Sequence, residues 1–147
     1  MRTILTAVLT GVAVLAATGS AKAQVVLVPH TTTHLDVVPH RGHVHVVPHT
    51  QALYQKYAKD GLVIVGVHTP EYDEEHDLGG VASAIRQMGI TYPVAVDNSY
   101  ATWNAYKNRF WPALYLIDQN GKIVYSHYGE GNYDETETRV RRLLGKA

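Results

Sequence analysis

The stretch PALYLIDQNGKIVYSHY, residues 112–128, has the pattern of two β-strands joined by a tight turn. Apolar, β-branched and aromatic residues, which favour extended chain, fill both halves. Residues 119–121, Gln-Asn-Gly, are typical of a hairpin turn because asparagine and glycine tolerate left-handed backbone. A helix is predicted over residues 134–144, since acidic residues open it and arginines close it, as the helix dipole favours. The chain is therefore predicted to end strand, strand, helix.

Upstream of this stretch, helical and strand patterns alternate. Thr50 is a candidate helix cap before a helix to about Lys59, and LVIVGVH is a continuous apolar run of the kind found in buried parallel strands. The following segments are a helix, a strand and a helix. The predicted order is α-β-α-β-α-β-β-α, with elements at residues 50–59, 62–68, 78–88, 92–97, 99–108, 112–118, 122–128 and 134–144.

Three segments resemble one protein family. They are LYQKYAKDGLVIVGVHTPEY (53–72), GITYPVAVDNSYATWNAY (89–106) and FWPALYLIDQNGKIVYSHYGEGNYDETE (110–137). They are similar to the redoxin, or TlpA-like, domain at the C-terminal end of DipZ-type cytochrome c biogenesis proteins. The resemblance covers about residues 51–144. It implies an α/β, thioredoxin-like fold that is partial here: a mixed sheet with a terminal β-hairpin and a C-terminal helix.

The resemblance also implies a functional site, and the sequence departs from it. Trp111 and Pro112 match the family's cis-proline loop, which lies beside the redox centre in active members. Family members carry a strand and a C-x-x-C motif before the helix that contains residues 53–57, and this chain contains no cysteine. Because thiol–disulfide exchange requires a thiolate, the family's oxidoreductase activity is not expected unless a partner chain supplies cysteines. The remaining expectation is binding of a protein or peptide partner near Trp111 and Pro112.

The missing strand is interior in the family's sheet, so its loss would leave backbone groups unpaired. Two apolar segments are candidates for a substitute strand, VVLV (25–28) and HVHVV (43–47). The first has the longer tether to the domain and so fewer geometric constraints. The alternative is a partial domain, joined to a leader and a repeat, with only a marginal fold.

The N-terminus has the pattern of a secretory signal peptide. Arg2 precedes an apolar run from Ile4 to Ala17, and Ala21-Lys22-Ala23 is a typical cleavage site. The predicted domains are a signal peptide at 1–23, a His-rich Val-Pro-His repeat segment at 24–50 and an N-terminally truncated redoxin domain at 51–147. The chain is therefore expected to be exported to the periplasm or the extracellular space, with no membrane span.

Six of the nine histidines lie between His30 and His49, among three Val-Pro-His repeats. This composition favours metal binding, and neutral imidazole suits zinc or copper. In extended chain His43 and His45 share a face, and His40 and His49 lie in the neighbouring turns. These four histidines are the predicted metal ligands. The alternative is weak, nonspecific chelation, because the spacing matches no known zinc motif.

The other polar clusters are expected to be structural. Residues 71–77 form an acidic loop. Its negative charge is expected to stabilise the N-terminus of the following helix rather than to form a cation site. His68 and His127 are expected to be structural histidines. The aromatic residues between Trp103 and Tyr115 are expected to be core. The formal net charge is zero, which does not suggest a nucleic-acid partner.

Overall fold

The computed structural model describes residues 23–28 and 46–146 of the chain. Strands and helices follow one another in the predicted order, with one additional strand at the front. The elements are β1 (Ala23–Val28), α1 (Val46–Tyr57), η1 (Ala58–Asp60), β2 (Leu62–His68), η2 (Asp73–His76), α2 (Leu78–Gln87), β3 (Val94–Val96), α3 (Ala101–Ala105), β4 (Ala113–Asp118), β5 (Ile123–Tyr128) and α4 (Tyr133–Leu143).

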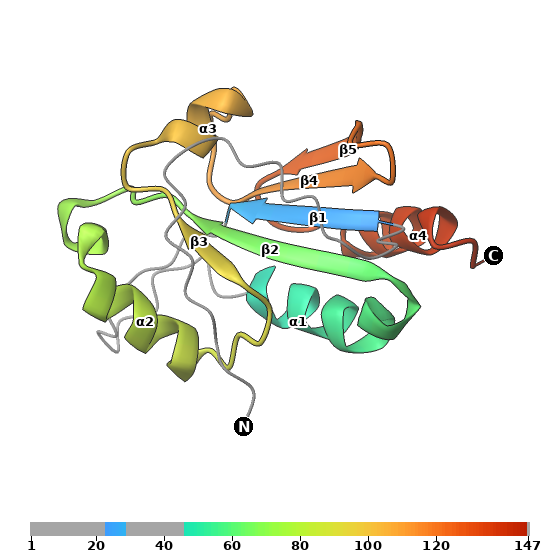
Figure 1. The fold of residues 1–147 in the computed structure, drawn as a ribbon, viewed down its shortest axis with the longest axis horizontal. Helices are drawn as coiled ribbons and strands as arrows, with labels where there is room; N and C mark the ends of the chain where they lie inside the picture. The colour runs from blue at the N-terminus through green and yellow to red at the C-terminus, as the bar shows by residue number, and fades with distance from the viewer. Residues whose placement is uncertain (1–22, 29–45, 147) are drawn as a thin grey trace.

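The additional strand lies in the middle of the sheet. The strand order is β3-β2-β1-β4-β5, with β1 parallel to β2 and antiparallel to β4 (Figure 1). Of the two candidate segments, VVLV is therefore the one that supplies the missing strand. The alternative, HVHVV, is wrong for Val46 and Val47, which belong to α1, while residues 43–45 lie outside the described residues.

The first helix begins earlier than the sequence predicts. α1 starts at Val46, so Thr50 lies inside the helix and is not its cap. Pro48 is compatible with this position because the first N–H groups of a helix have no intrahelical partner to lose. Residues 46–50, which the sequence places in the repeat segment, are therefore helical. Burial of Val46 and Val47 against the sheet offsets the poor helix propensity of this start.

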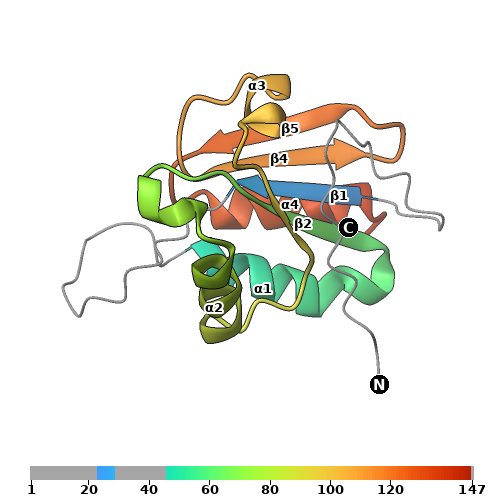
Figure 2. The ribbon, with the colours of Figure 1, turned by 60° about the vertical axis from the view of Figure 1, so that its left-hand side comes forward.

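Helices α1 and α4 lie on one side of the sheet and α3 on the other (Figure 2), and each face carries its own apolar cluster. Side chains alternate along β4, so Leu114 and Leu116 pack under α1 and α4 while Tyr115 packs under α3 on the other face. The larger cluster joins α1, α4 and the sheet through Val46, Leu53, Tyr57, Leu62, Ile64, Tyr92, Leu114, Leu116, Val140 and Leu144. The smaller cluster is built by Val67, Ala113 and Tyr115, with Trp103, Tyr106 and Trp111 packed against it.

The turns agree with the predicted pattern, although two elements are shorter. The Asp118 carboxylate accepts from the N–H groups of Asn120 and Lys122, which fixes the hairpin between β4 and β5. The hydrogen bond from Lys122 is the main reason that the pKa of Asp118 is lowered. The predicted strand at 92–97 and helix at 99–108 shorten to β3 and α3. The buried Asp97 ends the strand and accepts from the N–H groups of Thr102 and Trp103.

In the part of the chain that the structure describes, no helix is long and apolar enough to cross a membrane.

A proline in β1 tests whether the substitute strand holds the sheet together. Val26 lies opposite Val65 of β2 and Tyr115 of β4. Val26→Pro removes a backbone donor, and leaving its acceptor unpaired costs at least ~1 kcal/mol. We expect the urea midpoint, followed by circular dichroism, to fall sharply. Val26→Ile keeps the N–H and an apolar, β-branched side chain, so it should unfold much closer to the parent than the proline variant does. Equal midpoints for all three proteins would mean that β1 is not part of the folded sheet.

Candidate functional site

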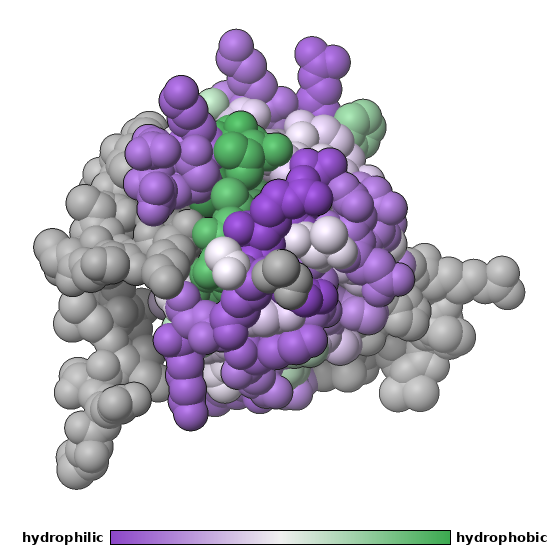
Figure 3. All heavy atoms as spheres, turned by 90° about the vertical axis from the view of Figure 1, so that its right-hand side faces the viewer, coloured by the Kyte–Doolittle hydropathy of each residue, from purple (hydrophilic) through white to green (hydrophobic). Residues whose placement is uncertain are grey.

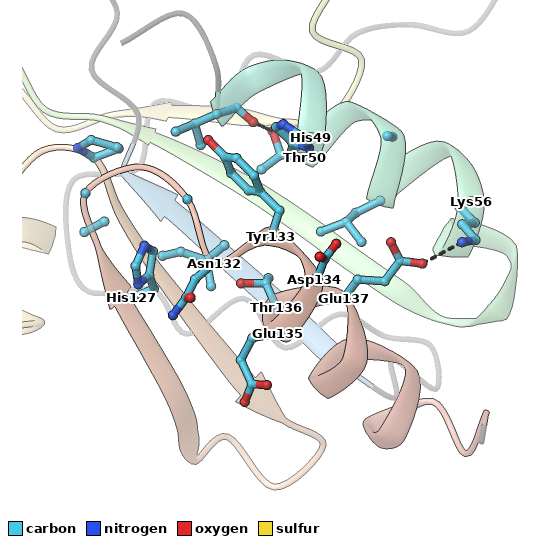
Figure 4. Close-up of a pocket in the computed structure, with 18 residues that line it drawn as sticks. His49, Thr50, Lys56, His127, Asn132, Tyr133, Asp134, Glu135, Thr136 and Glu137 are labelled. Atoms are coloured by element: carbon cyan, nitrogen blue, oxygen red, sulfur yellow. Dashed lines mark hydrogen bonds and ion pairs between the residues drawn. The ribbon is translucent and has the colours of Figure 1, made fainter. Parts of the chain in front are cut away.

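A pocket of about 800 Å³ opens between the first half of α1, the start of α4 and the segment Pro112–Leu114 (Figure 4). His127 and the following loop, through Gly129 and Gly131, complete its wall. The other side chains that line it are Val46, His49, Thr50, Ala52, Leu53, Lys56, Asn132, Tyr133, Asp134, Glu135, Thr136 and Glu137. Its position therefore combines the predicted Trp111–Pro112 loop with the beginning of the first helix.

The loop before α4 aims Tyr133 across this pocket. Gly129, Gly131 and Asn132 all have positive φ, which turns the chain sharply from β5 into α4. Tyr133 is then the first residue of α4, and its ring stacks on His49 of α1, with ring centroids 3.6 Å apart and planes 13° from parallel. Figure 4 shows the two rings meeting from opposite helices. The Tyr133 hydroxyl is buried and has no hydrogen-bond partner, so it is available to a molecule that enters the pocket.

A buried hydroxyl pair forms the floor of the pocket beside α1. Thr50 is 2% exposed, and its hydroxyl lies 3.0 Å from the Tyr92 hydroxyl and within hydrogen-bond distance of the Val46 and Val47 carbonyls. Burial raises the pKa of Tyr92, and the Thr50 hydrogen bond opposes that rise. The pair ties α1 to the segment before β3.

An ion pair connects α1 to α4 at the other end of the pocket. Lys56 Nζ lies 2.5 Å from Glu137 Oε1, and the Tyr57 hydroxyl donates to the same oxygen at 2.6 Å. The Lys56 hydrogen bond is the main reason that the pKa of Glu137 is lowered, and the Glu137 hydrogen bond is the main reason that the pKa of Lys56 is raised. The two helices are thus held together at both ends of the pocket.

The Trp111–Pro112 loop lies at the entrance. The Trp111–Pro112 peptide bond is cis. Trp111 is fixed by its indole N–H, which donates to the Thr69 carbonyl at 3.0 Å, and by its ring, 4.1 Å from that of Trp103. The first turn of α1 is Val46, Val47, Pro48 and His49, and the whole sequence contains no cysteine. The pocket therefore offers shape and hydrogen-bonding groups but no thiol.

Of the predicted metal ligands, the structure places one. His49 is exposed on α1 and stacks on Tyr133, whereas His40, His43 and His45 lie outside the described residues. Within residues 23–28 and 46–146, no group of three or more His, Asp or Glu side chains is arranged to hold a metal ion. The described residues therefore do not form a metal site by themselves. The predicted ligands in the repeat remain a prediction, because they lie outside the described residues.

The acidic loop has the structural role that the sequence favours. Asp77 caps α2 by accepting from the Gly80 N–H at 2.6 Å, and the Glu75 carboxylate accepts from the N–H groups of Glu71 and Tyr72. The other histidines are also held in place. His68 is fully buried with Nε2 2.8 Å from the Glu75 carbonyl, and His127 Nε2 lies 3.2 Å from the Glu130 carbonyl.

The aromatic residues follow the sequence prediction with one exception. Tyr115 is buried, and Trp103, Tyr106 and Trp111 pack against its cluster. Phe110 is 57% exposed, so its assignment to the core is wrong. It precedes the strand and has no buried position on β4.

Residues 41–144 match the Redoxin family. The chain belongs to the redoxin family. It is 52% identical to Protein DipZ of Mycobacterium bovis and of Mycobacterium tuberculosis over 101 residues, which are 69% of this chain and 14% of DipZ. It is also 30% identical to the thiol-disulfide oxidoreductase YkuV of Bacillus subtilis over 100 residues, which are 68% of this chain and 67% of YkuV.

Solved structures show that this redoxin has the thioredoxin-like fold. A thiol-disulfide isomerase from Corynebacterium glutamicum superposes with a TM-score of 0.71 at 23% identity, covering 86% of this chain and 83% of that one. The predicted α/β, thioredoxin-like fold is therefore confirmed. The chain spans only about one seventh of the length of the DipZ proteins. It is similar to redox proteins without carrying a cysteine of its own.

Sequence reasoning did not single out Tyr133 or the Lys56–Glu137 pair, and it assigned Thr50 only as a helix cap. The sequence signal near Tyr133 is the Gly131-Asn132 turn immediately before an acid-rich helix. This signal predicts where the helix begins, but not which helix lies opposite Tyr133 in the fold. The partners come from α1, more than seventy residues earlier in the chain. Only the tertiary fold brings them together.

Removing the Thr50 hydroxyl is expected to destabilise the pocket floor. Thr50→Val keeps the shape but leaves the buried Tyr92 hydroxyl unpaired, at a cost of ~1–3 kcal/mol in unfolding free energy. Adding Tyr92→Phe removes the orphaned group and should recover part of the loss. Urea denaturation of the two single variants and the double variant measures the coupling. Strictly additive losses would contradict a direct hydroxyl pair.

The Glu137 contact predicts a pH dependence. Its pKa is lowered in the folded chain, so it contributes stability above the unfolded value of about 4.3 and loses that contribution as the pH falls. Glu137→Gln should therefore be less stable than the parent near neutral pH and equal to it in acid. Thermal melts between neutral and acidic pH check this. A difference that persists unchanged in acid would contradict an ionic origin.

Proposed function

We propose that this redoxin is an exported binding protein that receives a segment of a partner protein in the pocket between α1, α4 and Pro112. The observation that carries the proposal is a pocket of about 800 Å³ beside the cis proline, in a chain without any thiol. Binding needs only shape and hydrogen bonds, and both remain. Electron transfer through a dithiol needs cysteine, and the sequence has none.

The lining of the pocket supports a peptide-like ligand. Leu53 and Leu114 provide apolar contact, while His49, Asn132 and the unpaired Tyr133 hydroxyl provide polar groups around them. Ligand sites combine apolar walls with polar groups that orient the ligand, and this pocket has both kinds of side chain. The wall is held by packed helices, so little of it has to be ordered on binding.

Export is supported by the way β1 continues from the predicted cleavage site. β1 begins at Ala23, so cleavage after Ala23 leaves Gln24 to Val28 in the strand. Those residues keep their register with β2 and β4. The mature chain would therefore retain the central strand, and removal of the leader is compatible with the fold.

A second candidate function is transition-metal binding by the repeat, with His40, His43, His45 and His49 as ligands for zinc or copper. Its support is the concentration of six of the nine histidines between His30 and His49. Calorimetric titration with zinc and with copper tests it. Affinity equal to that of a free peptide of residues 29–49 would argue against a site that the protein organises.

Filling the pocket tests the binding function. Ala52 is exposed on α1 and lines the pocket, whereas Gln55 is exposed on the same helix and does not line it. The probe is carboxymethylated α-lactalbumin, an unfolded chain whose cysteines are blocked. We expect the parent and Gln55→Trp to bind it in calorimetry and Ala52→Trp to bind at least tenfold more weakly.

The redox assay is the complementary control. The parent should fail to catalyse reduction of insulin by dithiothreitol above the uncatalysed rate. Catalysed insulin reduction would contradict the loss of thiol chemistry.

In the binding experiment with carboxymethylated α-lactalbumin, equal affinities of Ala52→Trp and Gln55→Trp would contradict the pocket as the binding site.

A further inference from the structure

The outer edge of the sheet carries a second surface, away from the pocket. Phe110, Ile123, Val124 and Tyr128 are 57%, 51%, 42% and 45% exposed, and they lie on β5 or against it. The Phe110 and Tyr128 rings meet edge to face, with centroids 5.8 Å apart. We call these four residues the β5 edge patch. Figure 3 looks onto the end of the molecule where β5 begins, and apolar atoms reach the surface there among polar side chains.

Among the described residues, the backbone of β5 has hydrogen-bonding groups without a partner at this edge. Of the described strands, β5 is the last in the sheet and pairs with β4 alone. The Gly129 N–H donates to the Pro112 carbonyl at 2.8 Å, and the ladder continues with His127 opposite Leu114. Since bonded and non-bonded pairs alternate along an antiparallel ladder, Ser126 and Tyr128 turn their N–H and C=O groups outward.

The second half of the strand lacks the features that usually protect an edge. The residues of β5, Ile-Val-Tyr-Ser-His-Tyr, include no proline and no Asp, Glu, Lys or Arg. Natural edge strands commonly carry such residues to prevent pairing with another chain. A register shift opposite Leu116 and Ile117 distorts the beginning of β5. The half from Ser126 to Tyr128 remains regular and open.

Charges at the two ends of β5 select the direction of pairing. Lys122 precedes the strand and is exposed, while Glu130 follows it. The Glu130 side chain is half-buried. An antiparallel copy of the same strand places the lysine end of one copy beside the glutamate end of the other, at both ends. A parallel copy would place like charges together.

We propose that β5 is a homodimer interface, at which the β5 strands of two copies pair antiparallel about a two-fold axis and join the two sheets. The same two outward-facing residues serve both copies, because Ser126 of one strand meets Tyr128 of the other. The β5 edge patch of each copy then covers the patch of its partner. Such an interface is self-complementary, as two-fold symmetry requires.

The test is the molar mass of the purified chain by light scattering after gel filtration. The parent should have twice the chain mass at high concentration and should dissociate on dilution. Ser126→Lys places a charge at the pairing edge and should give the mass of one chain at all concentrations. Gln87→Lys adds the same charge at an exposed position on α2 and should remain dimeric.

A proline variant separates backbone pairing from side-chain effects. The Ser126 N–H faces outward, so Ser126→Pro removes no hydrogen bond to β4. We expect this variant to keep the parent's circular dichroism spectrum and cooperative melt, and to have the mass of one chain. A parent of single-chain mass at every concentration would overturn the proposal. So would a dimer that survives both Ser126 substitutions.

Discussion

Pairing of β1 with both of its neighbours is the interaction on which the rest of the structure depends. β2 and β3 form one half of the sheet, β4 and β5 form the other, and β1 provides the backbone hydrogen bonds between them. Without it, two interior edges would expose unpaired N–H and C=O groups, which is costly in the interior of a fold. The two helices that build the pocket also lie over this central part of the sheet, so the site depends on the same strand.

The pocket lies beside a cis proline in a chain that carries no cysteine. The cis proline and the packed indole of Trp111 are held by contacts that require no thiol. Around the pocket, a His49–Tyr133 stack and a Thr50–Tyr92 hydroxyl pair join elements that are far apart in sequence. Fold and reactivity have separate physical requirements, because packing needs buried area whereas catalysis needs particular atoms.

Prediction from sequence was most successful where the pattern was local. The β4–β5 hairpin, the strand at residues 62–68 and the acid-to-base polarity of α4 follow from neighbouring residues alone. It failed at the start of α1, because Thr50 resembles a cap while burial of Val46 and Val47 extends the helix beyond it. The pocket partners of Tyr133 and Glu137 were not predictable, since no local pattern indicates which helix lies opposite. Phe110 was misassigned because its strand neighbours are apolar although it lies outside the strand.

The sequence by itself determined the class of fold, the family and the absence of thiol chemistry. These depend on hydrophobic period, on turn residues and on residue identity, all of which are written along the chain. Only the tertiary structure decided which segment fills the missing strand and which side chains meet around Pro112. Both outcomes depend on competition between distant segments for the same backbone partners and the same buried space. VVLV enters the sheet because it has the length of chain to reach it, while Val46 and Val47 are buried at the start of a helix.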